Sequence, residues 1–177
     1  RGRNEMIGRL SNTTALAAVL MAARAAAQEE SRRIVISIPD RKLVLIVDGQ
    51  VVKTYDTAVG AAKSPSPSGV FTIVNRIEKP AWYGPKQVVG PGKSNPLGTR
   101  WMGLSKKSYG IHGTNAPKSI GRNASHGCVR MRNRDVEELF KLVEVGDIVE
   151  IVAERTEEIA ALFGNPESAD PVAVAAE

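Results

Sequence analysis

The only cysteine of this 177-residue chain lies close in sequence to its only two histidines. Cys128 follows His126 by two residues and His112 by sixteen. A thiol with its ordinary pKa of about 8.5 is mostly protonated at pH 7, and a neighbouring imidazole can take the proton and leave a nucleophilic thiolate. Glycines on both sides of these residues let the backbone approach a bound substrate closely. The spacing predicts a cysteine acyl-transfer site.

The same three residues allow other interpretations. A lone cysteine is often a small buried apolar residue, and His112 alone could be a core histidine with satisfied hydrogen bonds. One cysteine and two histidines could also ligate zinc, but the sequence has no Cys-x-x-Cys or His-x-x-x-His spacing. A disulfide within the chain is impossible with one cysteine. The convergence of two histidines on one cysteine favours a catalytic site.

The segments around these residues resemble the signature of a known family. Residues 111–114 (Ile-His-Gly-Thr) and 125–130 (Ser-His-Gly-Cys-Val-Arg) are similar to the motif of the L,D-transpeptidases (YkuD-type catalytic domain) of bacterial cell walls. Residues 66–73 and 95–104 also match the family's pattern, and the four segments occur in its order. The resemblance covers residues 34–152. Arg130 departs from the strictest motif, in which some members have Asn, and this affects contacts with the substrate rather than the nucleophile.

The resemblance implies an enzyme that acts on the tetrapeptide stems of peptidoglycan. Cys128 would attack the carbonyl of the third stem residue, release D-alanine and pass the acyl group to an amine of another stem, which forms a 3-3 cross-link. The resemblance further implies roles in cell-wall biogenesis and cell shape, a periplasmic or cell-envelope location, and covalent inhibition by carbapenems. It implies no metal and no organic cofactor.

His112 is expected to be the general base of the site, and the backbone of Gly113 is expected to hold it. His112 lies on a separate segment from Cys128 and can face the thiol from the side, as a general base must. In the family the carbonyl of the next residue holds the imidazole ring, and Gly113 occupies that position here. That carbonyl would replace the acid of a Ser-His-Asp triad. On an extended segment His126 would project to the same side as Cys128 and assist the reaction.

Further candidates surround the nucleophile. The N–H groups of Gly127 and Cys128 are the expected oxyanion donors. Arg130 would bind a stem carboxylate through its planar guanidinium, although it could instead be a surface arginine. The local polar residue Ser125 would form a hydrogen bond nearby or cap a turn. Two aromatic residues are candidates to line the substrate groove, Tyr83 and Trp101, and Trp101 is also a candidate for the core.

The catalytic motif leaves the acceptor open. If water resolves the thioester, the enzyme is an L,D-carboxypeptidase. If the acceptor is an amine of an outer-membrane lipoprotein, the enzyme attaches that protein to peptidoglycan, or releases it. A domain that binds the wall without catalysis, with an inert thiol, is the remaining alternative.

Composition divides the chain into three parts. Residues 1–27 are a predicted signal peptide, because Arg1, Arg3 and Arg9 precede a small apolar run at 15–23 and a small-x-small site at 25–27. A retained amphipathic helix is the alternative. Residues 28–153 form the predicted catalytic domain. Residues 154–177 are expected to form a short helix at 154–163 and an acidic, solvated tail from 165 onward.

The charge of the chain is unevenly distributed. Residues 28–153 hold nineteen Lys and Arg against twelve Asp and Glu, whereas residues 154–177 hold one Arg against six acids. A basic catalytic domain suits an anionic polymer such as peptidoglycan, and a solvated basic surface explains the charge equally well. Nucleic acid is not an expected partner, because no recognition helix or aromatic-basic stripe occurs.

Short β-like runs follow one another along the predicted catalytic domain. Strands are expected at 34–38, 43–47, 51–55, 70–74 and 147–152, with Asp48-Gly49 as a hairpin turn. Residues 79–98 are rich in Gly, Pro and Lys without periodicity, and are expected to be irregular and to form one wall of the groove. Aromatic residues make up only 5%, so the core must consist mainly of aliphatic side chains.

One helix is expected to pack on these strands. Val136, Leu139, Phe140 and Val143 fall on one helical face, with Asn133 as the N-cap and a glycine at 146 closing the helix. Its positive N-terminal end would favour a Cys128 thiolate if it pointed at the thiol. The fold class is therefore mainly β with one packed helix, a compact β-sandwich or open barrel, which agrees with the β-rich fold that the resemblance implies.

Overall fold

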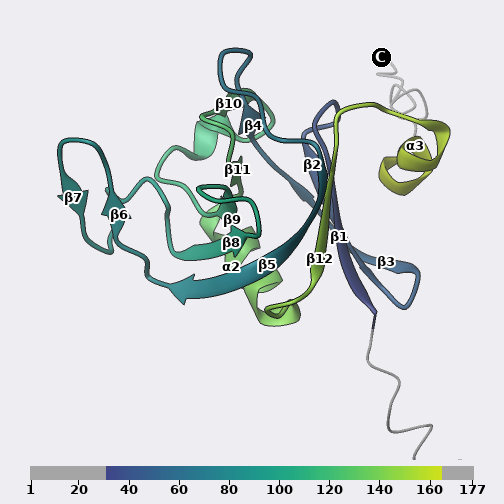
Figure 1. Ribbon diagram of the computed structural model, residues 1–177, viewed down its shortest axis with the longest axis horizontal. Helices are drawn as coiled ribbons and strands as arrows, with labels where there is room; N and C mark the ends of the chain where they lie inside the picture. The colour runs from purple at the N-terminus through teal and green to yellow at the C-terminus, as the bar shows by residue number, and fades with distance from the viewer. Residues whose placement is uncertain (1–30, 165–177) are drawn as a thin grey trace, which may run out of the picture. The chain divides into compact units, whose positions relative to one another are not determined.

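The computed structural model describes residues 31–164. The predicted signal peptide at 1–27 and the predicted tail from 165 onward lie outside the described residues. An eight-stranded sheet dominates the described part (Figure 1). Across the sheet the strands run in the order β11 (Val129–Arg130), β9 (Gly110–His112), β8 (Arg100–Leu104), β5 (Gly69–Glu78), β12 (Ile148–Val152), β1 (Arg32–Ser37), β2 (Lys42–Val47) and β3 (Gln50–Asp56).

Smaller elements complete the described residues. Two further strand pairs are β4 (Val59–Gly60) with β10 (Asn123–Ser125), and β6 (Trp82–Tyr83) with β7 (Val88–Val89). The helices are η1 (Pro117–Ser119), α2 (Asn133–Leu142) and α3 (Glu157–Phe163). Within residues 31–164 no helix is long and apolar enough to cross a membrane.

The hairpin of β2 and β3 forms at the predicted turn. Asp48 and Gly49 have φ angles of +49° and +78°, the left-handed conformation that a tight two-residue turn requires and that Asp-Gly tolerates. Alternate residues of β1 and β2 face opposite sides of the sheet. Ile34 and Leu45 join the main core, whereas Val35 packs under α3. Both faces are thus covered, which explains the continuous apolar runs in these strands.

Strand β5 joins the two halves of the sheet. Its first part, from Gly69 to Thr72, pairs with β12, and its second part pairs with β8 from Ile73 to Glu78. The register shifts between Ile73 and Asn75, and such a bulge bends a strand and increases its twist. The strand is visibly curved (Figure 1). Side chains from both ends of the sheet therefore meet in one cluster with helix α2 between them.

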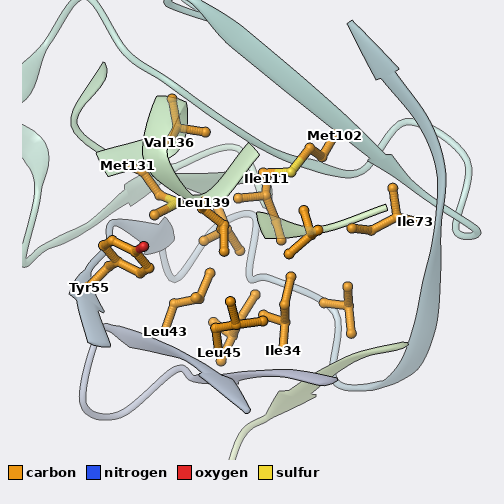
Figure 2. Packing of buried hydrophobic residues seen from close by; sticks show 14 of the residues in the cluster. Ile34, Leu43, Leu45, Tyr55, Ile73, Met102, Ile111, Met131, Val136 and Leu139 are labelled. Carbon is orange, nitrogen blue, oxygen red and sulfur yellow. The ribbon is translucent and has the colours of Figure 1, made fainter. Parts of the chain in front are cut away.

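Figure 2 shows this cluster, in which the side chains of α2 point toward those of the sheet. Val136, Leu139 and Phe140 are buried, as their helical spacing predicted. The labelled members are mostly aliphatic, as expected from the composition: Ile34, Leu43, Leu45, Tyr55, Ile73, Met102, Ile111, Met131, Val136 and Leu139.

The ends of helix α2 differ from the predicted ones. Arg132 is the N-cap and makes no side-chain capping bond, whereas Asn133 is the first helical residue. The helix ends at Leu142, and the next residue, Val143, is extended but still buried. Gly146, with φ +101°, belongs to the turn before β12. The prediction of the N-cap was wrong because the Asn133 side chain bonds to distant backbone groups instead.

The predicted fold class is confirmed, and the structure adds elements to it. Helix α3 lies within the segment 154–163 where a short helix was expected, and the Thr156 side chain caps it by accepting from Ile159 N–H at 3.3 Å. Strands β8 and β9 were not predicted as strands. The segment 79–98 is also less irregular than expected, since it contains the hairpin of β6 and β7.

Replacing Leu139 with alanine tests the packing of α2 against the sheet. Leu139 is fully buried in the main cluster, so we expect Leu139→Ala to lower the free energy of unfolding by about 2–5 kcal/mol. Leu142 lies on the same helix but is 37% exposed, and Leu142→Ala should cost much less, about 0.5 kcal/mol. Urea unfolding measures both, and equal losses would contradict this packing.

Candidate active site

Parallel pairing of β9 with β11 brings the histidine and cysteine motifs together. Ile111 lies opposite Val129 and His112 opposite Arg130. Extending this register by one residue places Cys128 opposite Gly110. Parallel neighbours need a crossover of about a dozen residues or more, and the chain between the two motifs supplies it through η1 and β10. The sixteen-residue spacing of the motif is therefore the length of this crossover.

His112 is oriented by the backbone of the next residue. The ring is 5% exposed, and its Nδ1 lies 2.5 Å from the Gly113 carbonyl oxygen. A carbonyl only accepts hydrogen bonds, so Nδ1 carries the proton and Nε2 keeps its lone pair. Trp101 stacks on the ring with centroids 5.7 Å apart. The contact with Gly113 that the resemblance implied is present, and Nε2 is the atom available as a base.

Burial keeps the imidazole neutral. It lowers the pKa of His112 to about 4, because the charged ring loses its hydration. The hydrogen bond to Gly113 raises this pKa, and the positive charge of Arg130 lowers it further. At pH 7 His112 is therefore an uncharged base.

Burial also keeps the Cys128 thiol protonated. It raises the pKa of the thiol, and the opposing effects of the Gly110 N–H and the Arg130 charge do not cancel it. Cys128 Sγ donates weakly to the Ser108 carbonyl oxygen at 3.6 Å. The start of α2 was expected to favour a thiolate only if it pointed at the thiol, and the net effect of the surroundings is a raised pKa of Cys128. The site at rest holds a neutral thiol beside a neutral imidazole.

The thiol opens onto a pocket of about 250 Å³. Its lining combines polar residues of the two motifs with apolar residues of the segment 79–98: His112, Ser125, His126, Cys128 and Arg130, together with Trp82, Pro96 and Leu97. The segment 79–98 thus lines the pocket that contains Cys128, and its role as a wall of the substrate groove stays a prediction. A larger hollow of about 670 Å³ lies between β3 and α2, but it is lined by charged surface residues and contains neither cysteine nor histidine.

Asn95 holds the apolar wall in shape. Its side chain is fully buried, and Nδ2 donates to the carbonyls of Pro80, Val89 and Gly90 at 2.7, 3.2 and 3.1 Å. Its Oδ1 accepts from Leu97 N–H at 2.8 Å. One carboxamide therefore links the start of the segment, the β6–β7 hairpin and the residue that faces the pocket. A buried polar group with all these bonds satisfied fixes its surroundings.

Ser125 organises the turn that presents the nucleophile. Its hydroxyl donates to the Cys128 carbonyl oxygen at 2.5 Å and accepts from Gly127 N–H at 3.0 Å. Gly127 has φ +107°, and an added Cβ would collide with the ring of Tyr109. The expected local bond of Ser125 is confirmed. The Gly127 N–H is engaged in this turn by its bond to the Ser125 hydroxyl, and its role as an oxyanion donor stays a prediction.

Two aromatic candidates lie elsewhere than expected. Tyr83 is 78% exposed and does not line the pocket, because adjacent strand residues face opposite sides and Trp82 takes that position. Trp101 lies behind His112, where its Nε1–H donates to Asn75 Oδ1 at 3.0 Å. His126 is exposed and lines the pocket, and Arg130 lines it as well.

Several residues of the site were not identified as site residues from the sequence. Trp82 and Leu97 form the apolar wall, and Leu97 falls within the matched segment 95–104. Ser108 faces the thiol through its carbonyl, which any residue type would supply. Asn95 and Asn133 act through long-range hydrogen bonds. An asparagine in a loop or at a helix start is too common to reveal such bonds.

Comparisons with known proteins agree with this geometry. The sequence model of the L,D-transpeptidase catalytic domain (YkuD) matches residues 31–151. The protein YkuD of Bacillus licheniformis, named as an L,D-transpeptidase, is 44% identical over 119 residues. That alignment covers 67% of this chain and 64% of the relative, so the chain spans somewhat less than two thirds of that relative's length.

Solved structures share the fold. An L,D-transpeptidase, LdtMt1, in complex with imipenem has a TM-score of 0.60 at 19% identity, over 70% of this chain and 59% of that one. L,D-transpeptidase 3 from Mycobacterium tuberculosis, solved with a faropenem-derived adduct, has a TM-score of 0.59 at 18% identity, over 71% and 61%. The sheet order, the pairing of the two motifs and the match of the family model over most of the chain lead to one conclusion: the chain belongs to the L,D-transpeptidase (YkuD) catalytic-domain family.

Proposed function

We propose that this chain is a cysteine acyl-transferase that forms 3-3 cross-links between peptidoglycan stem peptides, through a Cys128 thioester and with release of D-alanine. One observation carries the proposal: the Cys128 thiol shares a pocket with His112, whose Nδ1 is held by Gly113 so that Nε2 can accept a proton. Membership of the family supports peptidoglycan as the substrate.

In the first half-reaction, His112 Nε2 takes the thiol proton as Cys128 Sγ attacks the carbonyl carbon of the third stem residue. The bond to the nitrogen of the terminal D-alanine then breaks, and that nitrogen takes the proton from His112. The product is a thioester on Cys128 and free D-alanine. Because both groups are neutral at rest, proton transfer accompanies the attack instead of preceding it.

In the second half-reaction, an amine from a neighbouring stem attacks the thioester carbonyl. His112 takes a proton from this amine, the carbon–sulfur bond breaks, and the proton returns to the cysteine sulfur. The side-chain amine of a diamino acid in the acceptor stem gives the 3-3 linkage. Apolar side chains such as Trp82 and Leu97 shield the thioester from water on one side.

The remaining pocket residues have supporting roles in this proposal. The Cys128 N–H forms no hydrogen bond with the residues at 31–164 and is the backbone donor for the oxyanion. His126 is exposed at the pocket and assists the tetrahedral intermediate. Arg130 binds a stem carboxylate, and its guanidinium is well suited to a bidentate contact.

The proposal extends to inhibitors and location. Carbapenems acylate Cys128 in the same way as a stem carbonyl does, and the solved relative with imipenem supports this by analogy. The protein acts in the periplasm or cell envelope, where peptidoglycan lies. The arginine-flanked apolar run within residues 1–27 supports export by its sequence alone.

Product analysis tests the proposed reaction. The full chain is incubated with disaccharide-tetrapeptides beside a Cys128→Ala control, and the products are examined by mass spectrometry. We expect a cross-linked dimer that has lost one D-alanine, absent with the control. Tripeptide monomer alone would identify an L,D-carboxypeptidase, and transfer only to a lipoprotein amine would identify that acceptor. Products that persist with Cys128→Ala would contradict the proposal.

The dependence of the reaction rates on pH tests whether His112 and Cys128 are both uncharged at rest. Because the pKa of His112 is about 4, the base stays uncharged in mild acid, and the rate of Cys128 acylation by the donor stem should be retained at about pH 5 instead of falling near the ordinary imidazole pKa of about 6.5. Alkylation of Cys128 by iodoacetamide needs the thiolate. Since burial raises the thiol pKa, alkylation should be slow at pH 7 and increase above about pH 8.5. Fast alkylation at pH 6 would show that a thiolate is already present.

A further inference from the structure

The side chain of Asn133 bonds to two loops at once. Its Oδ1 accepts from Thr99 N–H at 3.3 Å and from Thr114 N–H at 3.1 Å. Its Nδ2 donates to the Thr114 carbonyl oxygen at 3.1 Å. Only the oxygen of a carboxamide can accept from two N–H groups, so the orientation of the side chain follows from its partners.

One of these bonds reaches the peptide group that holds the base. The Thr114 N–H and the Gly113 carbonyl belong to the same planar, trans peptide bond and point in opposite directions. Asn133 Oδ1 binds the N–H end, and His112 Nδ1 binds the carbonyl end. The bond from Asn133 to the Thr114 N–H therefore fixes the direction in which the Gly113 carbonyl points.

Tight packing holds this arrangement in place. A Cβ added to Gly113 or to Gly98 would overlap Asn133 Oδ1. Gly113 N–H is also bound, to the Arg100 carbonyl oxygen at 3.1 Å. The peptide groups on both sides of Gly113 thus have assigned partners, and the loop after β9 has little freedom to turn its carbonyl away from His112.

We propose that Asn133 is a positioning residue for the catalytic base: its carboxamide oxygen binds one end of the peptide group that joins Gly113 to Thr114, and the other end of that group orients His112. The inference rests on the proposed role of His112 as the general base. The order of groups is Asn133, peptide, His112, Cys128, so a peptide bond stands where a direct side-chain contact orients histidine in a Ser-His-Asp triad.

The arrangement has two physical consequences. Aligned hydrogen bonds polarise one another, so the bond from Asn133 strengthens the hold of the Gly113 carbonyl on Nδ1–H. The carboxamide does so without placing a charge next to a buried imidazole. Asn133 also follows Cys128 by only five residues on the same segment. The segment that carries the nucleophile therefore also supplies the group that positions the base.

The tautomer of His112 tests this role directly. In the full chain labelled with ¹⁵N-histidine, two-bond ¹H–¹⁵N spectra at pH 7 distinguish a ring protonated at Nδ1 from one protonated at Nε2. The chain has only two histidines, and a His126→Gln variant identifies the signals of the other. We expect the wild-type His112 to be protonated at Nδ1, and Asn133→Ala to add a clear Nε2–H population.

Two further variants make the test specific. Asn133→Asp keeps an oxygen for Thr114 N–H and should keep the Nδ1–H form. Asn115→Ala removes a comparable bond in the same loop, a donation to the Ser94 carbonyl oxygen at 2.9 Å, and should leave the tautomer unchanged. If Asn133→Ala does not fold, Asn133→Ser gives the same reading, since its hydroxyl is too short to reach both loops.

Kinetics provide the second readout. Loss of the general base costs about 10²–10⁴-fold, and a misoriented base should cost about 10-fold in the rate of Cys128 acylation, without a matching change in KM. A folded Asn133→Ala variant whose His112 remains fully in the Nδ1–H form would overturn the inference. If the tautomer shifts but the wild-type chain transfers no stem peptide, the proposed function fails and the positioning role stands.

Discussion

Strand β11 follows Cys128, the proposed nucleophile, and pairs in parallel with β9, which carries His112, the proposed base. This pairing sets His112 beside Arg130 and Cys128 beside Gly110, and the rest of the domain serves to maintain it. Strand β9 is held on its other side by β8, and β8 is held by the curved strand β5. Helix α2 begins directly after the nucleophile segment and packs into the core. Movement of α2 or of β5 would therefore move the thiol relative to the imidazole.

Burial determines the chemistry of the two reacting groups. It lowers the pKa of His112 and raises that of Cys128, so both changes favour the uncharged pair. Forming a thiolate–imidazolium pair would place a charge on the buried His112 ring, which costs hydration energy. Fixed backbone groups orient the two uncharged side chains. The Gly113 carbonyl binds His112 Nδ1–H, and the Gly110 N–H lies near the sulfur of Cys128. In the proposed mechanism, charge develops only when a substrate carbonyl is in place, which would limit unproductive reactions of the cysteine.

The sequence predicts the parts of this structure that local patterns encode. Cys128 and His112 were identifiable because cysteine and histidine are so rare in the chain, and the β2–β3 turn because Asp-Gly tolerates positive φ. Strands β8 and β9 were not predicted, since they are short and rich in glycine. Gly110 is required there by the close approach of Trp101, which is a tertiary contact. That Trp82 lines the pocket and Tyr83 does not likewise depends on which side of the strand faces the pocket. Local patterns thus give the reacting groups, whereas the groups that orient them depend on the fold.

The central claim is that Cys128 carries the acyl group between donor and acceptor. Intact-protein mass spectrometry of the full chain, quenched in acid during turnover with a disaccharide-tetrapeptide, tests it most directly. We expect an added mass equal to the donor minus D-alanine, located on the Cys128 peptide and removed by hydroxylamine, as a thioester is. Cross-linked product that accumulates while no acyl group is ever found on Cys128 would contradict it.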